Sequence, residues 1–111
     1  MAGIEEYRRI LVRILEEYAA LKPSLGDIEV ESVFDEVRDH YEITYAGWVK
    51  EERIHGPVVH VDIRGGKFWI QHDGTESGIA TELMEAGVPQ GDIVLAFLSP
   101  SERKHLKFAL S

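Results

Sequence analysis

The chain has 111 residues, of which 44% are hydrophobic and 29% are charged; this is typical of one soluble globular domain and excludes intrinsic disorder. The 12 basic residues stand against 20 acidic ones, and the net charge of −8 excludes a general binder of the nucleic-acid backbone. The lack of cysteine excludes disulfides and thiolate metal sites and fits a reducing compartment. The N-terminal residues include two acidic side chains, and the sequence contains no long apolar run. These features predict a cytoplasmic protein without signal peptide or membrane span.

Residues 4–21 have apolar side chains every three or four positions, with acidic and basic residues between them. This spacing predicts an amphipathic helix with one apolar stripe. The helix should end at residues 22–27, because Pro23 disfavours helical geometry at the residue before it and Gly26 supplies turn freedom.

Apolar and polar residues alternate over residues 28–35, 41–49 and 58–63, which is the pattern of half-buried strands. The short polar connections between these runs favour antiparallel hairpins over crossover helices. The clearest turn is Gly65-Gly66, since its glycines can take the positive φ angles of a tight two-residue hairpin. We therefore predict a four-stranded antiparallel meander whose last strand follows this turn.

The Gly65-Gly66 turn also predicts the register of the last hairpin. The expected pairs are Arg64 with Lys67, Ile63 with Phe68, Asp62 with Trp69, Val61 with Ile70, His60 with Gln71, and Val59 with His72. One face is apolar and should pack against helix residues Ile10, Leu11, Ile14 and Leu83; it contains Val59, Val61, Ile63, Phe68 and Ile70. The other face is polar with one large aromatic; it contains His60, Asp62, Trp69 and Gln71.

A second, shorter helix is predicted by the apolar spacing of residues 79–84. Asp73 or Thr75 can cap its start, Glu76 lies near the positive end of its dipole, and Gly87 can cap its end. Residues 92–98 form an apolar run that is either a last strand or a buried extended segment. The tail, residues 101–111, can form one or two helical turns.

The fold class that follows is α+β. It consists of an N-terminal amphipathic helix, a four-stranded antiparallel β-meander, a second helix and a C-terminal extended segment. The helices are expected on one face of the sheet, and residues 1–111 are expected to form a single domain.

Two metal-capable side chains, His60 and Asp62, share one strand face two residues apart. The predicted register sends His72 to the other face, so no third ligand is evident, and zinc or iron sites need three or four. The favoured interpretation is a solvated His-Asp pair. Acid–base catalysis by these residues, or by Asp73 and Glu76, needs a concave site that the sequence does not indicate. We therefore expect no catalytic residue, metal or cofactor.

Surface patterns suggest where partners bind. Residues 27–42 contain seven acidic residues and one base, Arg38, which indicates either a solvated face or a surface for a basic partner. Trp48 and Trp69 are better interface candidates, because both point away from the apolar stripe; alternatively, a second layer or the C-terminal segment covers them. The only local basic cluster lies in the tail. The candidate interaction face comprises Trp48, His60, Asp62, Trp69, Gln71, Arg103 and Lys104.

A series of motifs extends over nearly the whole chain: Arg38-Asp39-His40-Tyr41, Gly47-Trp48, His60-x-Asp62-Ile63, Gly66-Lys67-x-Trp69-Ile70-Gln71, Asp73-Gly74-Thr75-Glu76 and Gly87-Val88-Pro89. In this order they resemble the XisI-like proteins, the fdxN-element excision controlling factors of cyanobacteria. The tail departs from that pattern, with Leu98-Ser99-Pro100 where a His-Pro-Pro-like segment is expected. The resemblance implies control of the excision of a DNA element by a site-specific recombinase, alongside a companion of the XisH type that resembles a nuclease fold. It supplies no catalytic or ligand residues.

We therefore predict a non-enzymatic regulatory protein that contacts a XisH-type companion or the recombinase and forms a homodimer. The alternative is a small enzyme or ligand-binding module that uses His60, Asp62, Trp69 and Gln71. An enzyme needs a pocket where titratable groups converge, whereas an interaction protein needs an apolar patch with a polar rim. Neither strong direct binding of nucleic acid nor contact with a membrane is expected.

Overall fold

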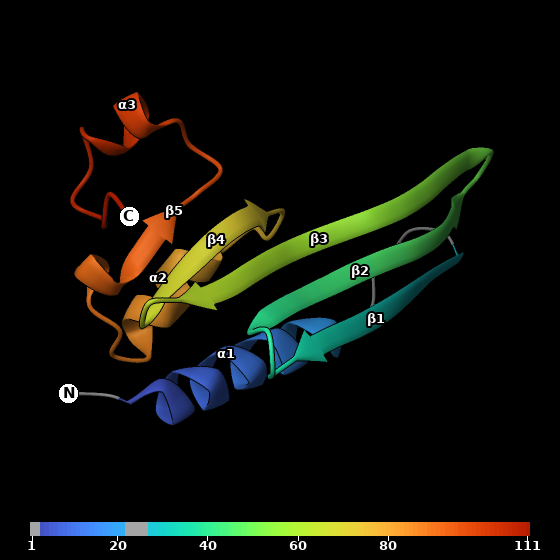
Figure 1. Cartoon of the computed structure of the whole chain (residues 1–111). Coiled ribbons are helices and arrows are strands. Elements are labelled where there is room, and N and C mark those ends of the chain that lie inside the picture. Colours follow the sequence, from blue (N-terminus) through green and yellow to red (C-terminus); the bar gives the residue numbers. More distant parts are fainter. Residues whose placement is uncertain (1–2, 22–26) are drawn as a thin grey trace.

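The computed structural model describes residues 3–21 and 27–111, so the turn predicted around Pro23 and Gly26 lies outside the described residues. Its elements, in chain order, are α1 (Ile4–Ala19), β1 (Asp27–Asp35), β2 (His40–Val49), β3 (Glu52–Arg64), β4 (Lys67–Asp73), α2 (Ile79–Glu85), the 3-10 turn η1 (Gln90–Asp92), β5 (Ile93–Leu95) and α3 (Pro100–Arg103). Figure 1 shows one twisted sheet, with the C-terminal segment beyond β5. Within the described ranges, no helix is long and apolar enough to cross a membrane.

The sheet has the strand order β1-β2-β3-β4-β5. The first four strands form the predicted antiparallel meander. The prediction of four strands was nevertheless one short, because Ile93–Leu95 pairs in parallel with β4. A parallel pair needs a crossover connection, and α2 supplies it between β4 and β5.

The β3–β4 register follows the prediction for the four pairs nearest the Gly65-Gly66 turn, from Arg64 with Lys67 to Val61 with Ile70. The next predicted pair was wrong, since His60 lies opposite His72 and Val59 lies opposite Asp73. A β-bulge at Gln71 inserts one extra residue into β4 and shifts every pair beyond it. The bulge leaves Gln71 beside Asp62, with Nε2 3.4 Å from Oδ2.

The core lies between this sheet and the two longer helices. The predicted core residues are buried: Leu11, Ile14, Val59, Val61, Ile63, Phe68, Ile70 and Leu83. Ile10 was predicted among them and is only partly buried, since it packs at the margin of the cluster. The helices therefore cover one face of the sheet, as predicted.

Two polar contacts hold α1 against the rest of the chain. The Arg8 guanidinium donates to both carboxylate oxygens of Asp39, at 2.7 and 2.9 Å, and the Tyr41 hydroxyl donates to Asp39 Oδ1 at 2.9 Å. Arg8 lowers the pKa of Asp39. On the same helix the Tyr7 hydroxyl donates to the Asp92 carboxylate, and burial raises the pKa of Tyr7 to about 12. Arg8 thus fixes the turn that immediately precedes β2.

Asp73 supports the start of α2, although Gly78 and not Asp73 or Thr75 occupies the N-cap position. Its Oδ2 accepts from the Ile79 backbone N–H at 2.7 Å, and its Oδ1 accepts from that of Thr75 at 2.9 Å. Thr75 Oγ1 in turn accepts from the Gly78 N–H at 3.0 Å. These bonds satisfy backbone donors at the helix start that have no partner within the helix.

Ile70→Ala tests the core. Ile70 is fully buried, so its truncation should lower the free energy of unfolding by about 2–5 kcal/mol. Val37→Ala is the matched control, because Val37 is 91% exposed in the β1–β2 turn, and it should change stability by less than about 0.5 kcal/mol. Urea unfolding measures both; equal losses would contradict this burial pattern.

Asp39→Asn tests the Arg8 contact through its pH dependence. Because Arg8 lowers the folded-state pKa of Asp39, the ionised carboxylate stabilises the fold above its unfolded pKa, and this contribution disappears as the pH falls through the lower folded value. Asp39→Asn should be less stable than the wild type at neutral pH, and the difference should shrink as the pH falls below about 4, the ordinary range of an aspartate. Unfolding across this range, with exposed Glu51→Gln as control, measures it; a constant difference argues against the pairing.

Candidate functional site

The face of the sheet opposite the helices contains the polar side chains that alternate with the core residues. His40 and Glu42 come from β2, His60 and Asp62 from β3, and Gln71 from β4. We call this surface the open face. The sequence analysis placed His60, Asp62, Trp69 and Gln71 on it correctly.

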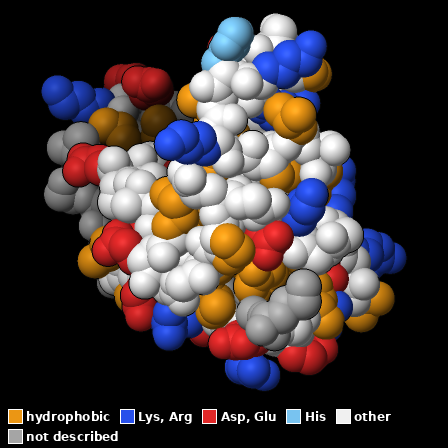
Figure 2. All heavy atoms as spheres, turned by 90° about the vertical axis from the view of Figure 1, so that its left-hand side faces the viewer, with side chains coloured by type: hydrophobic (Ala, Val, Ile, Leu, Met, Phe, Trp, Pro, Cys, Tyr) orange, Lys and Arg blue, Asp and Glu red, His pale blue; other side chains and the backbone are white. Residues whose placement is uncertain are grey.

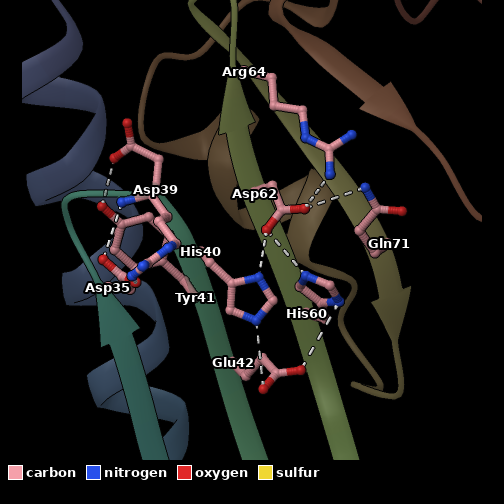
Figure 3. Close-up of polar contacts among 10 residues, drawn as sticks. Asp35, Asp39, His40, Tyr41, Glu42, His60, Asp62, Arg64 and Gln71 are labelled. Carbon is pink, nitrogen blue, oxygen red and sulfur yellow. Dashed lines mark hydrogen bonds and ion pairs between the residues drawn. The ribbon is translucent and has the colours of Figure 1, made fainter.

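The carboxylate of Asp62 is the centre of the open face. Asp62 is 5% exposed and is the buried charged residue of the described chain. Its Oδ1 lies 3.0 Å from His40 Nδ1 and 3.0 Å from His60 Nε2. Its Oδ2 accepts from Arg64 Nη2 at 2.9 Å and faces Gln71. Figure 3 shows these four side chains converging on Asp62 from three strands.

A second carboxylate, Glu42, lies on the other side of the two imidazoles (Figure 3). Its oxygens are 3.5 Å from His40 Nε2 and 4.0 Å from His60 Nδ1. The two rings contact each other, with centroids 4.3 Å apart and an interplanar angle of 50°. Each imidazole therefore has one nitrogen toward Asp62 and the other toward Glu42.

The pairing of β2 with β3 brings these groups together. His40 lies directly opposite Asp62, and Glu42 lies directly opposite His60. Opposite residues of an antiparallel pair have Cβ atoms about 4.5–5.5 Å apart, so this register places two histidines and two carboxylates in one compact cluster. We call His40, Glu42, His60 and Asp62 the Asp62 cluster.

Sequence reasoning identified half of this cluster. His40 and Glu42 were missed because the β2–β3 register cannot be derived from the sequence: Val58 forms a bulge in β3 that shifts the pairing between Ile43 and Thr44. The alternation of the β2 run, extended back by one residue, places His40 on the polar face and was the available signal.

The prediction that His72 lies on the other face was wrong, because the bulge at Gln71 places it directly opposite His60. Its side chain is exposed and does not belong to the group formed by His40, His60 and Asp62. Asp73 instead accepts from the first backbone N–H of α2.

The two tryptophans belong to different parts of the open face. Trp48 is 50% exposed near the far end of the β2–β3 hairpin, with the Arg53 guanidinium 5.4 Å from its ring centroid. Eight residues of strand separate it from His40, a distance of about 26 Å. Trp69 is half-buried opposite Asp62, with Arg64 5.7 Å from its ring centroid. The two tryptophans are therefore separate exposed or half-buried aromatic side chains and do not form one continuous patch.

The tail residues Arg103 and Lys104 lie at the end of α3. The tail pairs with β5, since the Ala109 N–H donates to Ile93 O at 2.9 Å. Arg103 is half-buried and donates to Leu110 O at 3.2 Å, whereas Lys104 is exposed. Figure 2 shows that on this side of the molecule basic and acidic side chains are interspersed and form no continuous basic surface.

One hollow lies on the helix side of the sheet, away from the open face. A cavity of about 630 Å³ is lined by Glu17 and Tyr18 of α1, Tyr45 of β2, and Glu76 and Glu82 at and before α2. Tyr45 alternates with the open-face residues of β2 and points to the helix side. The Asp62 cluster does not line this cavity, and it is open to solvent at the sheet surface, since the His40 side chain is 37% exposed.

The comparisons with known proteins agree with this fold. The family model described as XisI protein matches residues 1–110. A crystal structure of a XisI-like protein from Anabaena variabilis ATCC 29413 is similar, with a TM-score of 0.90 and 34% identity over 98% of this chain and 100% of that one. A crystal structure of the fdxN element excision controlling factor XisI from the same organism has a TM-score of 0.81 and 35% identity over 95% and 96% of the two chains.

Among curated proteins, no sequence matches the chain. The family match nevertheless covers almost every residue, and both solved relatives share the complete fold at more than 30% identity. The resemblance expected from the motifs is thereby confirmed, and the chain belongs to the XisI family.

Proposed function

We propose that this chain is a non-enzymatic accessory protein that regulates the excision of a DNA element by a site-specific recombinase through protein–protein contacts. Its family membership supports a regulatory role, because one solved relative is named an excision controlling factor. The observation that supports action through contacts is the open face, which places half-exposed Trp48 on the side of the sheet away from α1 and α2. We propose a cytoplasmic location and a single functional domain.

The end of the open face around Trp48 suits a basic partner. Trp48 lies opposite Asp27 of β1, and Glu29 and Glu31 share that face of β1 by strand alternation. The tryptophans were predicted to be better interface candidates than the acidic strands, and in the structure Trp48 and the acidic side chains of β1 are neighbours. Like carboxylates repel across a twofold axis, so we assign this end to a companion of the XisH type or to the recombinase.

Self-association is assigned to the other end of the open face. Trp69 lies there opposite Val94 of β5, which in turn pairs with Ala109 of the tail, and the tail also contains Arg103 and Lys104. This end is at the opposite edge of the sheet from the acidic strand β1, so two copies can meet here without bringing those carboxylates together. A symmetric dimer is the commonest way for a soluble protein to cover such a surface.

A ligand-binding module is the second candidate function. The convergence of His40, His60 and Arg64 on the buried Asp62 carboxylate supports it. The two imidazoles and the Asp62 carboxylate can ligate an ion, whereas Arg64 orients the carboxylate by donating to its Oδ2. The second candidate therefore concerns an ion and is compatible with a regulatory role.

Binding to DNA tests the proposed indirect action. At physiological salt the purified protein should have no appreciable affinity for random duplex DNA, because its net charge is −8 and its basic side chains are interspersed with acidic ones on the tail side (Figure 2). A fluorescence anisotropy titration at two salt concentrations measures this. Tight binding that weakens steeply with salt would place the protein among direct DNA binders.

Substitution of the two tryptophans tests the proposed contacts. If each anchors its interface, Trp48→Ala should weaken capture of a XisH-type companion, and Trp69→Ala should weaken self-association, each by about 2 kcal/mol or roughly 30-fold. Capture assays and sedimentation measure the two effects, and circular dichroism checks the fold. Exposed Val37→Ala is the control. Unchanged mass and unchanged capture in both tryptophan variants would show that the interfaces lie elsewhere.

A further inference from the structure

Three side chains of the Asp62 cluster direct one metal-binding atom each toward a common point. One ligand atom each of His40, His60 and Asp62 lies within 4.8 Å of the other two, and Asp62 Oδ1 is 3.0 Å from His40 Nδ1 and 3.0 Å from His60 Nε2. A tetrahedral zinc ion with bonds of about 2.0–2.2 Å holds its ligand atoms roughly 3.3 Å apart. The two Asp62–histidine separations are therefore close to the spacing that a bound ion requires.

The groups behind these atoms are those that orient metal ligands. Metal-binding histidines usually direct their second ring nitrogen to a carboxylate, and Glu42 faces that nitrogen of both His40 and His60. Arg64 and Gln71 hold Asp62 Oδ2 and leave Oδ1 for the ion. The cluster thus has an inner set of three donors and an outer set that fixes their orientation.

The charge of the cluster favours a cation. With neutral imidazoles, Asp62 and Glu42 place two negative charges against the one positive charge of Arg64. Buried charges in proteins are paired or coordinate metals, and the Asp62 carboxylate is 5% exposed. A divalent ion bound between the two histidines and Asp62 compensates the remaining negative charge.

We propose that His40, His60 and Asp62 bind a divalent transition-metal ion, with zinc as the preferred ion. Imidazole donors suit zinc, iron, copper and nickel, whereas magnesium and calcium prefer oxygen alone. Three protein ligands leave at least one coordination position free. The site is open to solvent at His40, whose side chain is 37% exposed, so a water molecule or a side chain of a bound partner can complete the coordination.

Titration of the untagged full-length chain tests the proposal. Co²⁺ serves as the spectroscopic probe, since its visible absorption reports nitrogen and oxygen ligation, and calorimetry measures Zn²⁺ binding directly. We expect one ion per chain. His40→Gln, His60→Gln and Asp62→Asn should each abolish binding, and Glu42→Gln should weaken it by about 10–100-fold.

The chain contains matched controls. His55 and His105 are exposed histidines outside the cluster, so His55→Gln and His105→Gln should bind as the wild type does. Absence of binding to the wild type, binding that survives in both His40→Gln and His60→Gln, or an equal loss in the controls would overturn the proposal. The two histidine variants decide the question even where Asp62→Asn fails to fold. The titration needs no companion protein, so its outcome is independent of the proposed protein contacts.

Discussion

The burial of one carboxylate organises the open face of this protein. Asp62 lies on a central strand with 5% of its surface exposed, and a buried charge is tolerated only when paired. Four neighbours supply that pairing: His40 and His60 at one oxygen, Arg64 and Gln71 at the other. A buried ionic group is weak evidence for stability, because apolar replacements are often as stable. Because Asp62 lies on the face of the sheet away from the core, we infer that this ionic group serves binding.

Stability and binding are separated between the two faces of the sheet. The helix side contains the apolar cluster, and the Arg8–Asp39 pair anchors α1 to the turn before β2. That turn leads directly into His40, so the anchor that positions the helix also fixes the first histidine of the cluster. The open face contributes little apolar packing and presents instead Trp48, the Asp62 cluster and Trp69. Substitutions on the open face can thus alter contacts without removing the core.

The parts predicted from the sequence are those that local geometry determines. Gly65-Gly66 permits one tight hairpin, and the pairs from Arg64–Lys67 to Val61–Ile70 follow from it. Prediction failed where a pairing depends on distant segments. The bulges at Gln71 and Val58 shift the register at positions that the local sequence does not mark. The parallel pairing of β5 with β4 depends on the α2 crossover. The same limit applies to the site. His60 and Asp62 were predicted together because they share a strand, whereas His40 was missed because it joins them only through the β2–β3 register.

The central claim is that the Asp62 carboxylate holds the His60 imidazole through its Nε2 atom, 3.0 Å from Oδ1, and the tautomer of His60 tests it most directly. An ionised carboxylate only accepts hydrogen bonds, so in the metal-free protein Nε2 of His60 must carry the hydrogen. Long-range ¹H–¹⁵N NMR at about pH 8, where ordinary histidines are neutral, identifies the protonated nitrogen. The account predicts hydrogen on Nε2 of His60. Hydrogen on His60 Nδ1, the tautomer that Glu42 alone would select, would contradict it.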